Sequence, residues 1–254
     1  KYILIAVGVI LVAMFFLYQY FAQNILGAIV STIVMAVAGF FFAAIAGYLV
    51  GLIGSSNNPI SGLTLSTLIV AALLMVFFGV SGKPGIAAVL GVAAVVCCSC
   101  GIAGDMMQDL KVGHLLGGTP WKMEIGEMIG VIFAASVMIF PIMILDMGDG
   151  IGSKNLPAPQ ASLMAMLAKG IVGGQMAWPL VIVGFFMGLG FILIKAQAPM
   201  LVAVGMYLPF NVTFAIFIGG IIKGVVGLIL KKRKLQSQEL MTADNKGVLL
   251  ASGL

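Results

Sequence analysis

The stretch Ser55-Ser56-Asn57-Asn58-Pro59-Ile60-Ser61-Gly62 decides how this sequence folds. It lies within a run, from residue 2 to residue 82, that contains no charged side chain. A run this long and apolar is typical of segments that are embedded in a lipid bilayer, where each unpaired backbone group costs several kcal/mol. Apart from Ile60, the residues of the stretch are small, polar or helix-breaking, so they cannot face lipid. We expect them to line a cavity inside a membrane protein.

The composition of the whole chain agrees with a membrane location. Hydrophobic residues make up 62% of the chain and charged residues 8%, against about 45–50% and about 25% in soluble domains. Most of the apolar runs approach the roughly 20 residues that a helix needs to cross a bilayer. We predict an all-α, polytopic membrane helix bundle with about seven transmembrane helices and with discontinuous or re-entrant segments. The runs are 2–20, 25–54, 63–80, 86–103, 128–145, 176–194 and 212–230.

Both ends of the chain have the features of internal sequence. The chain opens at Lys1 without an initiator Met or a signal peptide, and residues 247–254 resemble the start of another apolar segment. We therefore expect residues 1–254 to form one membrane domain that is truncated at both ends. A site found in this domain would then be part of a larger one.

A polar stretch, residues 104–127, separates two apolar runs and is interpreted as an inter-helix loop. Asp105, Gln108 and Asp109 would share one face if the preceding helix continued through them. Acids inside a membrane are functional by default, whereas acids in a solvated loop need not be, and composition leaves both interpretations open. The ionisable residues of the stretch are Asp105, Asp109, Lys111, His114, Lys122, Glu124 and Glu127.

Two further interruptions follow along the chain. Residues 146–175 are expected to form a polar loop with an interfacial or re-entrant helix at 162–172, which is too short to span. Within 205–211, Pro209 lacks a backbone donor and Asn211 brings polar atoms, although a lone Pro can also mark a simple kink. Two broken apolar segments point to a central binding site in a transporter. The candidate binding residues are Asn57, Asn58, Pro59, Ser61, Gly62, Tyr207, Pro209 and Asn211.

The sequence indicates no metal site, no cofactor and no nucleic-acid partner. Cys97, Cys98 and Cys100 would point over too wide an arc of one helix to ligate zinc together, and small apolar packing explains them. The phosphate-binding pattern Gly-x-x-x-x-Gly-Lys-Ser/Thr is absent from the sequence. The basic cluster at 231–234 suits an anchor to anionic membrane lipid better than a nucleic-acid patch.

Three motifs, in this order, resemble signatures of the oligopeptide transporter family, whose plant branch includes the yellow-stripe carriers of metal chelates. The first motif extends from Ala46-Gly47-Tyr48 to Ser61-Gly62-Leu63-Thr64 and has the core Asn-Pro-Ile-Ser-Gly. The second is Gly-Asp-Met-Met-Gln-Asp-Leu-Lys-Val-Gly at 104–113, and the third is Ala-Val-Gly-Met-Tyr-Leu-Pro-Phe at 203–210. The three motifs are short, but they are spread along most of the chain, from residue 46 to residue 210.

The resemblance implies an all-helical carrier of small peptides or peptide-like metal chelates that moves them with protons. This chain would correspond to the C-terminal half without its last helix, so the N-terminal half of the same transporter is an expected partner. Residues 115–122 differ from the Lys-Ile-Pro-Pro-Arg run of the eukaryotic peptide carriers, which favours a bacterial or archaeal relative in the cytoplasmic membrane. Glu127 stands where the family often has Gln, as a lineage-specific proton site or as a helix-start acid.

The leading functional prediction is secondary active transport, as a proton-coupled symporter and not as an enzyme. Amides and backbone groups at 57–62, with a helix N-terminus after Pro59, would receive the polar groups of a peptide. Asp105, Asp109 or Glu127 would carry the coupling proton. The sequence offers no catalytic residue for this activity.

Two other classes of function are weaker alternatives. An intramembrane protease would need Ser81 and His114 as a dyad, but Ser81 lies beside Lys83-Pro84 in a predicted surface turn. A channel or a non-transporting membrane subunit stays open on composition, although no repeated filter motif is present. A requirement for a proton gradient would separate a coupled carrier from a channel.

Overall fold

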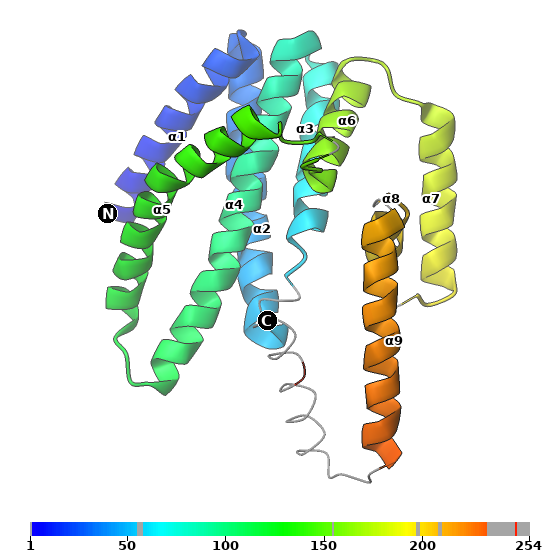
Figure 1. Ribbon diagram of the computed structural model, residues 1–254. Helices are drawn as coiled ribbons and strands as arrows, with labels where there is room; N and C mark the ends of the chain where they lie inside the picture. Colours follow the sequence, from blue (N-terminus) through cyan, green and yellow to red (C-terminus); the bar gives the residue numbers. More distant parts are fainter. Residues whose placement is uncertain are drawn as a thin grey trace. The chain divides into compact units, whose positions relative to one another are not determined.

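The computed structural model describes residues 2–54, 58–153, 155–196, 199–207, 210–232 and 247 (Figure 1). All regular structure in these residues is helical, which confirms the predicted all-α fold. The chain divides into two units, residues 1–191 and 192–254, and each is described by itself. The helices are α1 (Tyr2–Ala22), α2 (Ile25–Ile53), α3 (Ile60–Phe77), α4 (Gly82–Leu115), α5 (Pro120–Gly148), α6 (Pro159–Val172), α7 (Trp178–Leu193), α8 (Pro199–Tyr207) and α9 (Phe210–Lys232).

The apolar runs of the sequence coincide with helices. Six of the described helices are long and apolar enough to cross a membrane, namely α1, α2, α3, α4, α5 and α9. The remaining run coincides with α7, which is apolar but only 16 residues long. The protein is therefore an integral membrane protein with a polytopic helix bundle.

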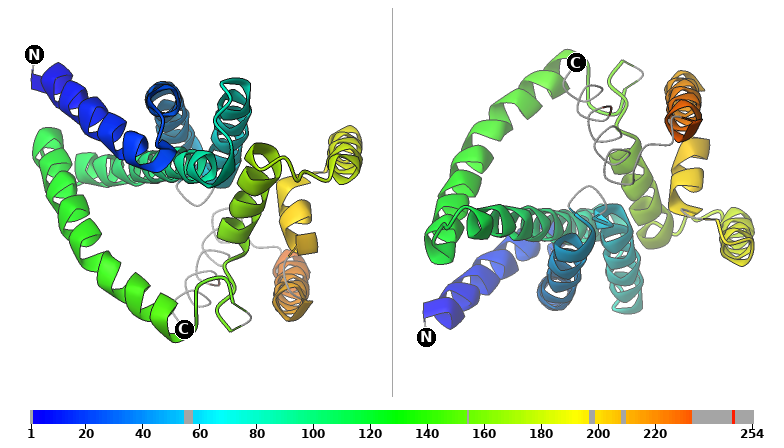
Figure 2. Two further views of the ribbon diagram at one scale, coloured as in Figure 1. Left: turned by 90° about the horizontal axis from the view of Figure 1, so that it is seen from above. Right: turned by 90° about the horizontal axis from the view of Figure 1, so that it is seen from below.

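Helix α4 is the central helix of the first unit. It packs against α1, α2, α3, α5 and α6, and Figure 2 shows α1, α2 and α3 gathered on one side of it. The core contains the fully buried side chains of Val89 and Val92 from α4, with Tyr18 from α1 and Leu68 from α3. None of the described residues of α5 is buried.

Close contacts at glycines fix the direction of α2 relative to α4. A Cβ atom on Gly27 would lie 3.4 Å from the side chain of Val80, just before α4 begins. A Cβ atom on Gly47 would lie 3.2 Å from Met107, near the other end of α4. Helix α2 therefore runs parallel to α4, and α3 runs antiparallel to both (Figure 1). Glycine permits such close approach because it has no side chain.

Buried hydroxyl groups in α3 are satisfied within the helix. Thr64 Oγ1 donates to the carbonyl of Ile60 at 2.7 Å, and Thr67 Oγ1 donates to that of Leu63 at 2.9 Å. Such bonds to the preceding turn remove the cost of an unpaired hydroxyl in apolar surroundings. These threonines therefore need no ligand to explain them.

The stretch 104–127, expected as a loop, is mainly helical. Helix α4 continues to Leu115 and α5 begins at Pro120, so only residues 116–119 lie outside the two helices. Pro120 occupies the first turn of α5, where its missing N–H would have no helical partner. In 146–175, α6 (Pro159–Val172) contains the expected short helix at 162–172, and it packs against α3 and α4.

The second unit contains the interruption expected at 205–211. Thr213 Oγ1 of α9 donates to the carbonyl of Gly205 in α8 at 3.3 Å. The rings of Phe210 and Phe214 stack with their centroids 5.8 Å apart at the start of α9. A side chain of α9 thus bonds back across the interruption to α8.

Candidate functional site

The polar connection between α2 and α3 is the first candidate site. Helix α2 ends at Ile53, and Gly54 has a φ of 86°, a conformation that glycine adopts without strain. Asn58 and Pro59 are also non-helical, and α3 begins at Ile60. The predicted interruption is therefore present, and Asn57 lies outside the described residues.

The start of α3 lies partway along α4. The side chain of Asn58 bonds to Cys100 of α4, and α4 continues from there to Leu115. At 1.5 Å per residue, this continuation is about 22 Å long. A Cβ atom on Gly101 would lie 3.8 Å from Ile60, which places the first residue of α3 at the same level. The polar connection thus lies beside the middle of α4 and not beside its end.

Asn58 has one amide atom bonded and one amide atom without a partner. Its Nδ2 donates to the backbone carbonyl of Cys100 at 3.1 Å. Its Oδ1 is buried and has no hydrogen-bond partner among the described residues. A buried acceptor without a donor is costly, so this oxygen is suited to a ligand that brings an N–H group.

The first turn of α3 supplies groups of the opposite kind. Pro59 occupies the cap position and gives no side-chain hydrogen bond to the helix. The first N–H groups of a helix have no intrahelical acceptor, and the helix dipole favours an anion near them. Ser61 and Gly62 lie half-buried in this turn, beside Asn58. The connection therefore offers an acceptor and a set of donors to one ligand.

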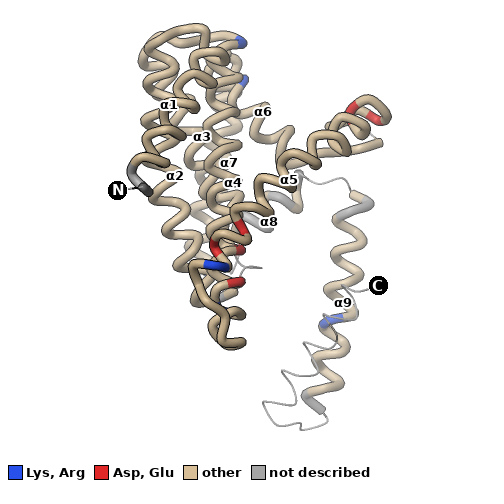
Figure 3. The backbone as a smooth tube through the Cα atoms, turned by 90° about the vertical axis from the view of Figure 1, so that its left-hand side faces the viewer, with Lys and Arg blue, Asp and Glu red and all other residues tan. Residues whose placement is uncertain are grey.

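The predicted acids lie where α4 and α5 face each other (Figure 3). Asp109 of α4 and Glu127 of α5 line one cavity of about 370 Å³. Asp105 stands one turn before Asp109 on α4. The other lining residues are Leu110, Val112, Gly113, Leu116 and Met123. The structure thus brings acids from two helices to one cavity.

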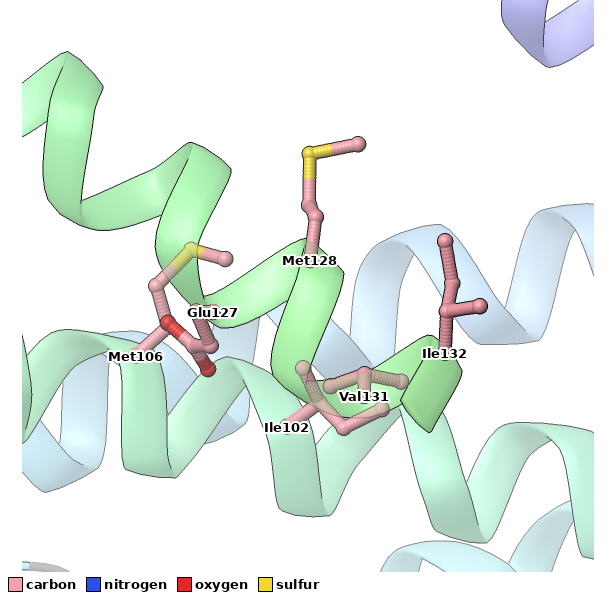
Figure 4. Close-up of a pocket in the computed structure, with 6 residues that line it drawn as sticks. All are labelled: Ile102, Met106, Glu127, Met128, Val131 and Ile132. Atoms are coloured by element: carbon pink, nitrogen blue, oxygen red, sulfur yellow. The ribbon is translucent and has the colours of Figure 1, made fainter. Parts of the chain in front are cut away.

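Glu127 also lines a second cavity, of about 230 Å³, whose other walls are apolar. Figure 4 shows the side chain of Glu127 beside that of Met106, between α5 and α4. The side chain of Met128 points away from Glu127. Glu127 is half-buried, whereas Asp105 and Asp109 are exposed. The remaining walls are Ile102, Val131 and Ile132. Glu127 is therefore the acid that belongs to both cavities, a position that its place in the sequence does not indicate.

The second interruption lies between α8 and α9. Helix α8 ends at Tyr207 and α9 begins at Phe210. Pro209 lies outside the described residues, as do the side chains of Tyr207 and Asn211. Of the predicted binding residues, the structure brings together Asn58, Pro59, Ser61 and Gly62 at the start of α3.

The geometry excludes the protease dyad. Ser81 occupies the cap position at the start of α4, and His114 lies in the last turn of the same helix. The helix between them is about 50 Å long at 1.5 Å per residue, whereas a nucleophile and its base must be within hydrogen-bond distance.

The cysteines lie within α4. Cys100 is buried in a cluster with Ala46 and Val96, whereas Cys98 is exposed. Among the described residues, no group of three or more His, Cys, Asp or Glu side chains is placed to hold a metal ion. Burial of Cys100 agrees with its expected role in apolar packing.

Comparisons with known proteins point to one family. The family model described as "OPT oligopeptide transporter protein" matches residues 1–254. The "Putative oligopeptide transporter" of Haemophilus influenzae is 31% identical over 265 aligned residues, which cover 91% of this chain and 41% of that protein. This chain therefore spans less than half the length of that relative. No solved structure matches the chain.

Proposed function

This chain belongs to the oligopeptide transporter family, and we propose that it forms part of a secondary transporter of small peptides or peptide-like metal chelates. The proposal rests on the start of α3, where it contacts α4. There, the Oδ1 of Asn58, which has no hydrogen-bond partner among the described residues, lies beside a helix N-terminus that Pro59 does not cap with a side-chain bond. Such a junction of polar backbone with packed helices is a common way to build a transport site.

The chemistry of a peptide fits these groups. A peptide carries N–H and ammonium donors, which suit the acceptor oxygen of Asn58, and a carboxylate, which suits the N-terminus of α3. Pro59, Ser61 and Gly62 shape the same first turn. Asn57, next to Asn58 in the sequence, is included in this site. For the second interruption, we propose separately that Tyr207, Pro209 and Asn211 bind substrate.

The coupling proton is assigned to the acids between α4 and α5. Asp109 and Glu127 line one cavity, so a proton bound there neutralises one of two neighbouring negative charges. Asp105 is the third acid on this surface. Helix α4 carries both the carbonyl that binds Asn58 and the acid Asp109, so it is the element through which the two sites communicate.

We place the protein in a lipid bilayer. The activity is transport without chemical change of the substrate, in a cytoplasmic membrane. Large apolar side chains are exposed along α5 and α9, and they would contact lipid or the rest of the transporter.

The test uses the full-length protein that carries this chain, reconstituted in liposomes with an imposed proton gradient. Labelled di- to hexapeptides and metal chelates are offered separately, and uptake is measured with and without a protonophore. We expect saturable uptake of one substrate class that falls when the gradient is collapsed. Failure to take up either class would contradict the proposal, and saturable uptake that ignores the gradient would contradict proton coupling.

A further inference from the structure

We propose that Asn58 and Gly104 form a positioning contact that holds the start of α3 against α4. The inference rests on the proposed function in one respect, because the position of α3 then sets the geometry of the substrate site. The proposed contact does not involve the acids that are assigned to the coupling proton. The contact joins the first and second sequence motifs, which are more than 40 positions apart in the chain.

Gly104 leaves the space that the amide of Asn58 occupies. The residue is buried within α4, and a Cβ atom on it would lie only 2.5 Å from Nδ2 of Asn58. A Cβ atom does not approach a neighbour this closely, so alanine at this position would displace the amide. The same Cβ atom would lie 3.1 Å from a methyl group of Val50, which could yield by a few tenths of an ångström. The amide of Asn58 is therefore the main reason that this position requires glycine.

Asn58 is fixed at both its side chain and its backbone. Its Nδ2 donates to the carbonyl of Cys100 at 3.1 Å, and its own carbonyl accepts from the N–H of Ile60 at 2.9 Å. The first bond holds the residue to α4, and the second ties it to the first turn of α3. Loss of the first bond would free the start of α3 and leave the carbonyl of Cys100 without this donor.

Gly101 provides a matched control. It lies one turn before Gly104 on the same helix, and a Cβ atom on it would meet Ile60 at 3.8 Å, an ordinary contact distance. Gly101→Ala and Gly104→Ala therefore add the same methyl group and the same helix preference. Only Gly104→Ala collides with Asn58.

The first experiment measures substrate half-saturation in the full-length protein for Gly104→Ala, Gly101→Ala, Asn58→Ala and the double variant Asn58→Ala/Gly104→Ala. We expect Gly104→Ala and Asn58→Ala each to raise half-saturation about fivefold or more, as expected for one lost buried hydrogen bond. We expect the double variant to match Asn58→Ala, because the shorter side chain at position 58 leaves room for the added methyl group. Equal effects of Gly101→Ala and Gly104→Ala, or additive effects in the double variant, would overturn the proposal.

The second experiment does not depend on transport. In a background with Cys97, Cys98 and Cys100 replaced by Ala, Ser61→Cys is labelled in membranes with a water-soluble thiol reagent. We expect the labelling rate to rise about fivefold or more with Gly104→Ala and to stay unchanged with Gly101→Ala. If Gly104→Ala raises the labelling rate but the protein transports nothing, the positioning contact is supported and the transport function is rejected. If Gly104→Ala leaves the labelling rate unchanged, the positioning contact is rejected.

Discussion

Two regions bring polar groups to helix α4 in opposite ways. One is the α2–α3 connection, and the other is the region where Asp109 of α4 faces Glu127 of α5, here called the α4–α5 corner. At the connection, Asn58 is held by a hydrogen bond to Cys100 and by the absence of a side chain at Gly104. At the corner, Asp109 and Glu127 line an open cavity. A fixed polar group is suited to positioning a ligand, whereas a carboxylate beside a cavity is suited to gaining and losing a proton.

This difference assigns separate tasks to the two regions of one helix. Changes at the connection should alter how well the substrate binds, and changes at the corner should alter how transport depends on protons. Substitutions in each region therefore test whether the two tasks can be separated.

The largest effect is expected at the corner. In the double variant Asp109→Asn/Glu127→Gln, neutral amides replace both acids of the cavity. We expect gradient-driven accumulation to be lost entirely while substrate exchange continues, because an amide imitates the permanently protonated carboxyl. Accumulation and counterflow assays in liposomes measure the two properties.

Glu124→Gln is the matched control for this variant. Glu124 lies on α5, one turn before Glu127, and does not line the cavity. It should retain accumulation. An unchanged pH dependence of uptake in the double variant would reject Asp109 and Glu127 as the proton site and leave Asp105 as the next acid to test.

The next largest effect is expected for Gly62→Val at the connection. A branched side chain in the first turn of α3 would obstruct the approach of a substrate carboxylate to the backbone N–H groups. We expect uptake to fall about tenfold or more, equivalent to ~1.4 kcal/mol, with expression retained. Gly8→Val, at an exposed position with open space around it, is the control. Uptake at the wild-type level would count against this site.

A smaller effect is expected for Ser61→Ala. Its hydroxyl lies in the same first turn, and loss of one hydrogen bond to substrate should raise half-saturation about threefold. Ser66→Ala serves as the comparison, because the hydroxyl of Ser66 donates to the carbonyl of Gly62 at 2.9 Å and is already satisfied. If Ser66→Ala had the larger effect, the substrate would not bind along the first turn.

The smallest effect is expected for Ser81→Ala and His114→Ala. The two residues lie at opposite ends of α4, so neither should change uptake or peptide integrity. Mass spectrometry of the offered peptides would detect cleavage. Cleavage that either substitution abolished would restore the protease hypothesis.

Much of the fold follows from hydrophobicity along the chain. Each apolar run coincides with one helix, because the length of a run and its lack of charge are local properties that a bilayer selects. The stretch 104–127 was harder, since its charges suggested a loop. Leu115 and Pro120 bound a turn of only four residues, and the charged residues of the two helices are exposed except for the half-buried Glu127.

The site was predictable in its residue types and not in its pairings. The concentration of polar residues around Asn58 is visible in the sequence because lipid forbids it. The contact of Asn58 with Gly104 and the common cavity of Asp109 and Glu127 depend on how separate helices pack. No spacing within one segment encodes such contacts.

The most direct test of separate tasks is the pH dependence of substrate affinity, measured on the full-length wild-type protein, on Asn58→Ala and on Asp109→Asn/Glu127→Gln. We expect Asn58→Ala to weaken affinity by the same factor at every pH. We expect the acid double variant to bind equally well at every pH, with the affinity that the wild type has when protonated. A pH-dependent weakening in Asn58→Ala, together with an intact pH profile in the double variant, would show that the two regions do not have separate tasks.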